Sequence, residues 1–401
     1  MNERQETDFG SIPKSWNVAK IADLKANDKR AIAMGPFGSN IKAENFVSEG
    51  VPVIRGTNLN YSRYVDGNFV YLKEEKADEL IGSNCKPGDL VFTHRGTIGQ
   101  VGLIPYGKHS RYVISQSGMK LSVHPDLMDS NFLLYFFKSE FGQYQILKYE
   151  SQVGVPSISN PLTSLKEIQV PVPKLEEQKA IASVLSSLDD KIDLLHRQNT
   201  TLERMAETLF RQWFVEEAQE DWDIVPLGTL FEISSGKGLK KKQLSDAGLY
   251  PVLGANGEIG KTNDYLFNEK LIFTGRVGTL GNIFRVNNEK VWLSDNTLIF
   301  RNIKYFYFVY FALNKAGLSD YNVGSTQPLI RQSDIKSIEI YLPKNQKYLN
   351  KFETEAELIF AKINSNSKQI QTLEKLRDNL LPKLMSGDVR VLLQAESALC
   401  A

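Results

Sequence analysis

The most restrictive feature of this sequence is that its two halves repeat the same short segments in the same order. The echoed pairs are Trp16–Leu24 with Trp222–Leu230, Pro52–Ile54 with Pro251–Leu253, Leu90–Gly99 with Leu271–Gly281, Phe132–Phe137 with Phe306–Phe311, and Ile168–Pro173 with Ile338–Pro343. Chance can supply one such echo, but an ordered series indicates an internal duplication. A repeat of this length means that one structural unit occurs twice, so we expect two similar domains in one chain.

Each copy of the repeat has two parts. The first part, residues 10–172 and then 217–342, mixes short β-branched and aromatic runs with Gly, Pro and Asn. This pattern predicts an irregular globular α/β (α+β) domain with several short strands. The second part, residues 174–215 and then 345–386, has few glycines or prolines and predicts a long helix. Pro173 and Pro343 precede these helices, as is typical of helix starts.

Both predicted helices carry residues at alternating steps of four and three, which is the heptad pattern of a coiled coil. In the first helix this seam is Ile181, Leu185, Leu188, Ile192, Leu195, Asn199, Leu202, Ala206, Leu209 and Trp213. In the second helix it is Phe352, Ala356, Ile359, Ile363, Asn366, Ile370, Leu373, Arg377, Leu380 and Leu384. One such stripe is equally well explained by an ordinary core-facing helix, whereas two matched stripes favour a pair.

An antiparallel pairing of the two seams explains why each contains one asparagine. One register brings Asn199 opposite Asn366. In that register every other layer pairs apolar residues, except that Leu188 faces Arg377. A buried Asn pair lowers stability but specifies register, because any slip leaves an amide against hydrocarbon. We therefore predict an intramolecular antiparallel coiled coil whose register is fixed by Asn199 and Asn366.

The predicted coiled coil has a geometric consequence for the two globular domains. The seams cover about 33 residues, which at the helical rise gives a rod about 50 Å long. Domains at its two ends would be related by a pseudo-twofold axis and separated by about one to one and a half turns of B-DNA. One chain would then imitate a symmetric DNA-binding dimer while its two domains read different half-sites.

Composition narrows the remaining function classes. The chain has 48 Lys and Arg against 47 Asp and Glu, so any nucleic-acid contact must use local basic patches rather than a uniformly basic surface. Its two cysteines, Cys85 and Cys400, lack a ligand-spaced His cluster, which argues against a disulfide framework and a zinc site. The polar start and the lack of an apolar run of about 18 residues predict a soluble, cytoplasmic protein without a membrane span.

A set of short segments spread over nearly the whole sequence carries a family resemblance. These segments are Ile12-Pro13 with Trp16, Gly35–Ser39, Gly88–Phe92, Gly96–Gly99, Val170–Pro173 followed by Glu176-Glu177-Gln178, and Leu380–Gly387. No single segment is diagnostic, but the ordered double cycle is specific, and by it the chain resembles the specificity subunit of type I restriction-modification systems. The second copy departs from the first where Asn345-Gln346 stands in place of Glu-Glu-Gln.

The resemblance implies a division into four regions. Target recognition domains would occupy residues 1–172 and 217–342, and conserved helical regions would occupy residues 173–216 and 343–401, the latter with a C-terminal tail. Each recognition domain is expected to read one half of a bipartite, asymmetric site in double-stranded DNA. The helical regions are expected to bind two methyltransferase subunits, with restriction subunits in the full complex. This chain would be non-catalytic and bind no cofactor or metal itself, because S-adenosylmethionine, ATP and Mg²⁺ would reside on the partner subunits.

Candidate DNA-binding residues are small or polar residues of loops near basic side chains, because Arg, Lys, Asn and Gln reach phosphates and base edges. In the first domain they are Gly35, Phe37, Gly38, Ser39, Arg55, Thr57, Asn58, His94, Arg95, Thr97, Gln116 and Ser117. In the second they are Ser234, Ser235, Lys237, Lys240, Lys241, Lys242, Asn256, Arg276, Thr279, Asp295 and Asn296. The repeat aligns Arg95 with Arg276. For any one residue the alternative is a structural turn or a solvated charge.

Other functions fit the sequence less well. The stretch Ala255–Thr262 loosely matches a phosphate-binding loop, but no amphipathic helix follows Lys261-Thr262, as such a loop requires. A methyltransferase would need an Asn/Asp-Pro-Pro-aromatic motif, and Asn160–Thr163 is not close to one. The near-neutral charge leaves open a coiled-coil scaffold whose globular domains bind protein. A specificity protein that lacks enzyme partners is a narrower alternative.

Overall fold

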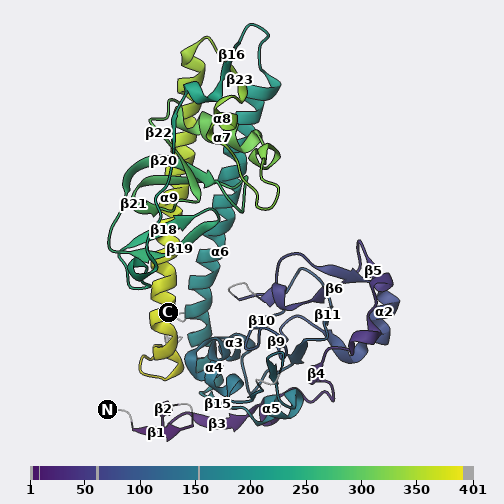
Figure 1. Cartoon of the computed structure of the whole chain (residues 1–401). Coiled ribbons are helices and arrows are strands. Elements are labelled where there is room, and N and C mark those ends of the chain that lie inside the picture. Colours follow the sequence, from purple (N-terminus) through teal and green to yellow (C-terminus); the bar gives the residue numbers. More distant parts are fainter. Residues whose placement is uncertain (1–2, 9, 60–62, 152–153, 392–401) are drawn as a thin grey trace, which may run out of the picture. The chain divides into compact units, whose positions relative to one another are not determined.

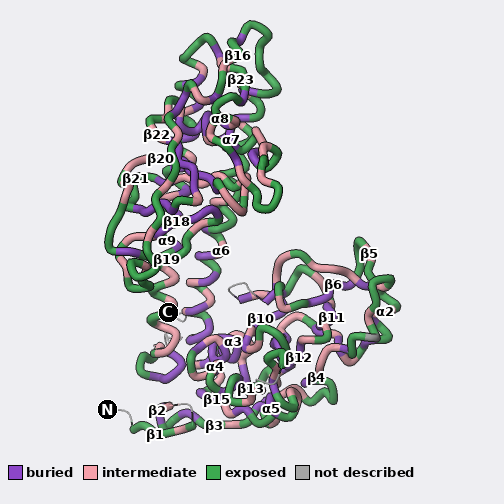
Figure 2. Tube along the Cα trace, viewed as in Figure 1, coloured by how far each residue is buried: buried purple, intermediate pink, exposed green. Residues whose placement is uncertain are grey.

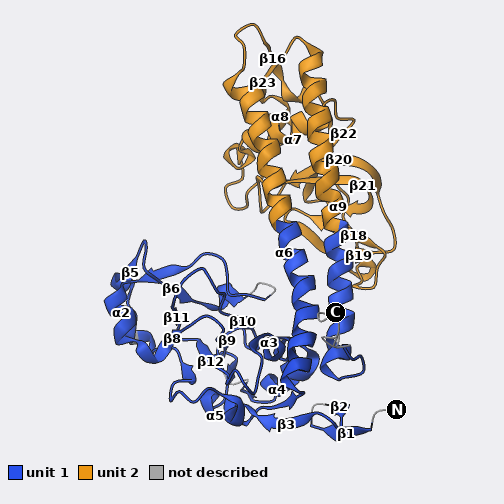
Figure 3. Cartoon of the chain, turned by 180° about the vertical axis from the view of Figure 1, so that it is seen from behind, with its two compact units in different colours: residues 1–196, 368–401 blue, residues 197–367 orange. Residues whose placement is uncertain are grey.

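A computed structural model of the chain describes residues 3–8, 10–59, 63–151 and 154–391. The chain forms two compact units, coloured separately in Figure 3. Unit 1 contains residues 1–196 and 368–401, and unit 2 contains residues 197–367. We call the globular part of unit 1 (residues 10–172) head 1 and that of unit 2 (residues 217–342) head 2. The long helices α6 (Leu175–Arg211) and α9 (Gln346–Met385) each contribute one segment to each unit.

Unit 1 contains two main sheets and several short strand pairs (Figure 1). The first sheet is antiparallel, in the order β10 (Val101–Leu103), β9 (Leu90–Thr93), β12 (Gly118–Leu121), β4 (Ile32–Met34). The second has the order β5 (Phe46–Val47), β7 (Val70–Leu72), β6 (Val51–Ile54), β11 (Tyr112–Ile114), β8 (Asn84–Cys85), with β6 and β11 parallel. The short pairs are β1 (Arg4–Thr7) with β2 (Gly10–Pro13), β3 (Asn17–Lys20) with β15 (Gln169–Val172), and β13 (Glu150–Ser151) with β14 (Ser157–Ile158).

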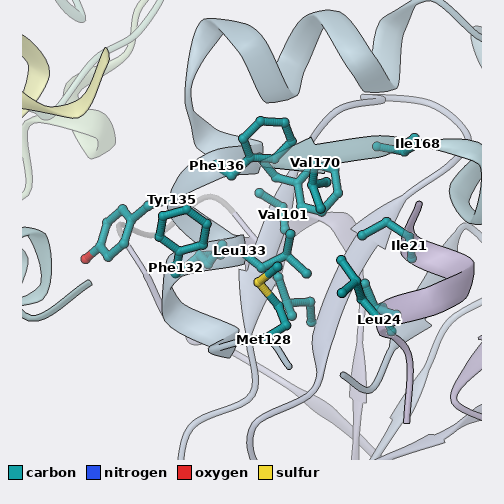
Figure 4. Packing of buried hydrophobic residues seen from close by; sticks show 14 of the residues in the cluster. Ile21, Leu24, Val101, Met128, Phe132, Leu133, Tyr135, Phe136, Ile168 and Val170 are labelled. Carbon is teal, nitrogen blue, oxygen red and sulfur yellow. The ribbon is translucent and has the colours of Figure 1, made fainter. Parts of the chain in front are cut away.

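The described part of head 1 has five short α-helices, of which all but the second contribute residues to its largest apolar core. They are α1 (Ile21–Leu24), α2 (Glu74–Glu79), α3 (Ser130–Lys138), α4 (Glu140–Leu147) and α5 (Pro161–Glu167). Phe132 and Phe136 of α3 pack with Ile21 and Val170 in this core (Figure 4). Every residue of β9 and β11 is buried (Figure 2). Because both faces of these strands are covered, their sequences are mostly apolar rather than alternating.

Head 2 is built around one six-stranded sheet. Its order is β17 (Glu232–Ser235), β22 (Thr297–Arg301), β20 (Phe267–Gly275), β21 (Ile283–Leu293), β18 (Tyr250–Gly254), β19 (Gly257–Thr262). The pair β16 (Asp223–Pro226) with β23 (Glu339–Leu342) matches β3 with β15 of head 1. Helices α7 (Phe306–Lys315) and α8 (Gln332–Lys336) complete the head. The predicted fold class, two α/β heads each followed by a long helix, is thereby confirmed.

Within each unit the segments of α6 and α9 pair antiparallel, as the seams predict. In unit 1, Ile192 and Leu195 of α6 form one apolar cluster with Ile370 and Leu373 of α9. The same register runs through unit 2, where the rings of Trp213 and Phe352 lie 6.2 Å apart between centroids. Trp213 belongs to a π-helical turn (Gln212–Glu216) that continues α6.

The two seam asparagines face each other in unit 2. The Nδ2 of Asn366 donates a hydrogen bond of 2.9 Å to the Oδ1 of Asn199. Asn366 is fully buried, and its own Oδ1 accepts no hydrogen bond among the described residues. A buried amide that is only partly satisfied lowers stability, but a slipped register would lose the Asn199–Asn366 bond as well and leave both amides against hydrocarbon. The larger cost of every wrong register is how such a pair specifies alignment.

The region that loosely matches a phosphate-binding loop is a strand. Lys261 and Thr262 lie on β19, paired with Pro251 and Tyr250 of β18, so no helix N-terminus is available to face a phosphate. In the described part of the chain, no helix is both long and apolar enough to cross a bilayer. The same residues contain no cluster of three His, Cys, Asp or Glu side chains arranged to hold a metal ion.

Candidate nucleic-acid interface

The strand order of head 1 brings most of its candidate segments to one edge. β12 is antiparallel to both β9 and β4, with Gly118 opposite Thr93 and Met119 opposite Met34. The ends of β4 and β9 therefore meet the start of β12, and residues 35–39, 94–97 and 115–117 leave the sheet together. The parallel strands β6 and β11 end at the same place, because the Ser115 N–H donates to the Ile54 carbonyl at 2.9 Å. Residues 55–58 join the edge in this way.

The candidate side chains on this edge differ in exposure. Seven are exposed, namely Phe37, Gly38, Arg55, Thr57, Arg95, Thr97 and Gln116, while Gly35 and Ser117 are half-buried. The side chain of Ser39 lies outside the described residues. Phe37 is 81% exposed, which is unusual for an aromatic residue and fits a surface that another molecule covers.

Two candidates of head 1 are buried and support the edge from inside. Asn58 is 1% exposed; its amide accepts from the Arg55 N–H at 3.0 Å and donates to the carbonyl of Asp66 at 3.0 Å. The His94 Nε2 lies 3.1 Å from the carbonyl oxygen of Gln116. Burial lowers the pKa of His94, so this imidazole is neutral at pH 7. Both side chains hold neighbouring loops in place and are not carried into the interface proposed below.

Head 2 gathers its candidates on the corresponding edge. Ser235 of β17 pairs with Leu298 of β22, and Gly275 of β20 pairs with Thr297 of β22. The segments that follow β17 and β20 therefore lie beside the residues that precede β22. The Lys237 N–H donates to the carbonyl of Leu293 at 2.9 Å, which ties the lysine-bearing segment to the same edge.

Nearly all candidates of head 2 are exposed. They are Ser234, Ser235, Lys237, Lys240, Lys241, Lys242, Asn256, Arg276, Thr279 and Asp295; Asn296 is half-buried. The Arg276 Nη1 donates to the Ser235 Oγ at 3.4 Å, and the Nε2 of Gln332 donates to the same oxygen at 3.3 Å. Gln332 was not among the sequence candidates, because it lies far along the chain in α8 and only the tertiary fold brings it beside Arg276.

The alignment of Arg95 with Arg276 is wrong by one residue. The Gly96 N–H donates to the Pro156 carbonyl at 2.9 Å, and the Gly278 N–H donates to the Pro328 carbonyl at 3.0 Å. This equivalence makes Val277 the counterpart of Arg95, and it makes Arg276 the counterpart of His94. The strand pairing shows the same shift of one residue. Thr93 pairs with Gly118 in head 1, and the residue in the equivalent position of head 2 is Gly275, although the sequences look more alike when Thr93 is aligned with Thr274. Adjacent residues of an extended segment point to opposite faces, so the two arginines cannot perform the same contact.

Comparison with known proteins identifies the class to which this architecture belongs. The family model described as the type I restriction modification DNA specificity domain matches residues 13–204 and 219–375, once for each copy of the repeat. The chain belongs to this family.

Individual relatives span nearly the whole chain. The type I restriction enzyme MjaIX specificity subunit of Methanocaldococcus jannaschii is 28% identical over 97% of this chain and 97% of its own length. The putative MjaX specificity subunit of the same organism is 23% identical over 96% of both chains. The crystal structure of an S subunit from M. genitalium shares the fold, with a TM-score of 0.61 and 20% identity over 92% of this chain and 96% of that one.

Proposed function

We propose that head 1 and head 2 each read one half of a bipartite, asymmetric site in duplex DNA, and that chemistry is left to partner subunits. The observation that carries this proposal is the recurrence of one polar strand edge in both heads, at the same place in the topology. Two edges of the same construction but with different side chains are what two readers of unlike half-sites require.

The charges on the two edges support DNA as the ligand. Head 1 exposes Arg55 and Arg95, and head 2 exposes Arg276 together with the run Lys240–Lys242. This run begins a single 3-10 turn (Lys241–Gln243) whose residues are all exposed, a position from which lysines can approach phosphates. Phosphate contacts position a protein on DNA, and base contacts specify the sequence. Local basic groups of this kind suffice even though the chain as a whole carries a formal charge of only +1.

The paired helices are proposed to set the spacing between half-sites and to dock two methyltransferase subunits. The antiparallel pairing and the Asn199–Asn366 contact support a fixed register, and a fixed register gives a fixed spacer. S-adenosylmethionine, ATP and Mg²⁺ would then be bound by the methyltransferase and restriction subunits of the complex rather than by this chain.

The proposal is tested by sequencing methylated adenines in cells that express this subunit with its cognate methyltransferase. We expect a split motif with two specified halves. Replacing head 1 by the head of another family member should change one half of the motif and leave the other half and the spacer as they were. If both halves changed together, the division of labour would be wrong.

DNA binding by the purified complex separates this proposal from a protein-binding scaffold. The affinity of a DNA reader falls steeply as salt rises, because neutralised phosphates release counterions. Replacing Arg276 by Ala should weaken duplex binding without unfolding the chain. If the complex did not bind DNA even at low salt, the result would favour the protein-binding scaffold instead.

A further inference from the structure

Each head holds a three-residue turn at the centre of its candidate interface. Turn 1 consists of Ser115, Gln116 and Ser117 and links β11 to β12; turn 2 consists of Ser294, Asp295 and Asn296 and links β21 to β22. The two turns differ in sequence at two of three positions. The backbone hydrogen bonds that hold the two turns nevertheless match.

Four backbone hydrogen bonds anchor each turn in matching positions. In head 1 the N–H groups of Ser115, Gly118, Gly35 and His94 donate to the carbonyls of Ile54, Ser115, Gly118 and Ser117, each at 2.9 Å. In head 2 the N–H groups of Ser294, Thr297, Gly236 and Arg276 donate to the carbonyls of Leu253, Ser294, Thr297 and Asn296, at 2.9, 3.1, 3.1 and 2.8 Å. Because all eight bonds use main-chain atoms, they hold the turn in place whatever side chain its central residue carries.

Glycines form the floor beneath each turn. A Cβ added to Gly35 would lie 1.8 Å from the Ser115 carbonyl oxygen, and one added to Gly236 would lie 2.0 Å from that of Ser294. No side chain fits in either place, so the backbone packs directly against the turn. Farther along, Gly38 lies beneath the Gln116 side chain, and Gly238 lies beneath Asp295, whose Oδ2 is 3.1 Å from where a Cβ would be.

The central side chains of both turns lie at the surface of the candidate interface. Gln116 and Asp295 are exposed, and in the described residues neither side chain accepts or donates a hydrogen bond. Asp295 also lines a hollow of about 340 Å³, and Gly238 and Lys240 are among the other residues that line it. The two turns therefore have matching backbones but present different groups, a free amide in head 1 and a free carboxylate in head 2. They differ in the hydrogen bonds that they can offer a ligand.

We propose that position 116 in head 1 and position 295 in head 2 are matched specificity-determining positions, with Gln116 reading an adenine and Asp295 a cytosine. This inference rests on the proposed function. The side-chain amide of Gln binds adenine in the major groove through two hydrogen bonds, since its oxygen accepts from the N6 amino group and its NH2 donates to N7. A carboxylate instead accepts from the N4 amino group of cytosine. Lys240, which lines the same hollow as Asp295, would offset part of the repulsion between this carboxylate and the phosphates. Arg95 and Arg276 do not occupy equivalent positions in the two heads, so they do not form a matched pair of this kind.

The test exchanges the two side chains in the full subunit, as Gln116→Asp and as Asp295→Gln, in complex with its methyltransferase. Sequencing of methylated adenines then reads the motif of each variant. We expect Gln116→Asp to change one base pair in one half of the motif, from A·T towards C·G, and Asp295→Gln to make the opposite change in the other half. In purified complexes, preference for the original base at that position should fall by roughly 10- to 100-fold.

Controls separate this inference from the function on which it rests. Asp264→Gln makes the same chemical change on an exposed residue that follows β19, at the other end of the sheet of head 2, and should leave the motif unchanged. If the unaltered subunit yields no split motif, the proposed function fails. If it yields one and both exchanges leave it as it was, only the present inference fails.

A variant that loses methylation altogether is resolved by two further measurements. Thermal denaturation shows whether it is folded, and binding to a pool of duplexes randomised in one half-site shows what it selects. A folded Gln116→Ala variant should accept any base at one position. Equal weakening for all sequences would overturn the inference.

Discussion

The two heads are fastened to the long helices by different chemistry. In unit 1 a polar contact adds to the apolar packing of head 1 on α6 and α9. The Tyr135 hydroxyl donates to Asp189 of α6 at 2.7 Å, and the Arg377 Nη1 of α9 reaches the same carboxylate at 3.0 Å. Figure 4 shows this hydroxyl directed away from the apolar cluster of head 1. A second ion pair, Arg63 with Asp190 at 2.5 Å, adds to it. Asp189 is 1% exposed, so its carboxylate is taken out of water, whereas Asp190 stays exposed.

In unit 2 the corresponding contact is aromatic. Phe352 of α9 lies within 6.2 Å, between ring centroids, of Phe311 in α7 of head 2 and of three rings at the end of the first long helix, Phe210, Trp213 and Phe214. Phe308 of α7 lies 4.9 Å from Phe214. Tyr307 of α7 also stacks on Phe360 at 4.8 Å with the rings nearly parallel. Apolar packing is non-directional, whereas a buried ion pair stabilises only when both partners stay in place. The duplicated fold therefore fixes where a head meets its helices, but not which forces join them.

The largest effect is expected for Phe352→Ala. Removing a fully buried ring that touches four others leaves a cavity and should lower the free energy of unfolding of unit 2 by about 3–5 kcal/mol. Urea unfolding measures the loss, and hydrogen exchange should locate it in unit 2. Leu358→Ala on the same helix is the control, because Leu358 is 64% exposed and should cost little. Equal losses for the two variants would contradict an aromatic attachment.

The next effect is expected in unit 1 for Arg377→Met. The substitution keeps most of the volume but leaves the buried Asp189 carboxylate without its cation, which should cost about 3 kcal/mol. Urea unfolding again measures the change. The exposed Lys375 of the same helix gives the control Lys375→Met. If Arg377→Met were as stable as its control, the polar attachment would be dispensable.

A smaller effect on stability is expected from the N-terminal caps of the two aromatic helices, α3 in head 1 and α7 in head 2. Asp129 accepts from the Phe132 N–H at 2.9 Å and caps α3 from within head 1. In unit 2 the cap comes from α9: Glu353 accepts from the Tyr307 and Phe308 N–H groups at 3.2 and 2.8 Å. Each Ala substitution should cost about 1 kcal/mol. Hydrogen exchange should show that Asp129→Ala loosens α3 alone, whereas Glu353→Ala also loosens α7 from α9. Thr354→Ala serves as the neighbouring control.

The smallest effect is a pH dependence of the free energy of unfolding that His94 gives to head 1. Desolvation lowers the pKa of His94 in the folded state, so the unfolded chain takes up a proton first as pH falls. The stability that neutral His94 contributes is therefore complete above its unfolded pKa of about 6.5 and declines as pH falls from there to the folded pKa. The counterpart of His94 in head 2 is Arg276, so head 2 has no histidine at this position.

The measurement is the difference in free energy of unfolding between the natural chain and His94→Gln, followed from pH 7.5 downwards. Other buried acids, such as Asp89, are common to both proteins and cancel. The difference should shrink or change sign in acid. A difference that does not vary with pH would show that His94 titrates alike in the folded and unfolded chain.

The parts of this molecule that sequence could predict are those encoded by periodic patterns. The heptad seams predicted the antiparallel pairing of α6 and α9, including the layer in which Trp213 meets Phe352, because each seam position is read directly from spacing. They also predicted that Leu188 faces Arg377, but not that the arginine turns to the neighbouring Asp189. A heptad records which residues face a partner helix and says nothing about a charge one position away.

The candidate interface was predictable as a set of loops but not as individual contacts. His94 and Asn58 look like surface readers in sequence, yet the strands around them bury both, since burial depends on neighbours distant in the chain. Gln332 was missed for the same reason. Arg95 and Arg276 were matched wrongly because two similar sequences can be aligned with a shift of one residue. Only the pairing of strands in the structure reveals that shift.

The backbone anchoring of turns 1 and 2 bears on how such a protein changes over generations. Because the anchoring bonds use main-chain atoms, we expect a point mutation at the tip of either turn to leave them intact and to cost little in folding. If the tips read bases as proposed, such a mutation would alter the ligand preference. Novelty can then be explored one substitution at a time, in one head while the other keeps its preference. A lineage under pressure to mark its own genome differently could acquire new preferences without rebuilding the protein.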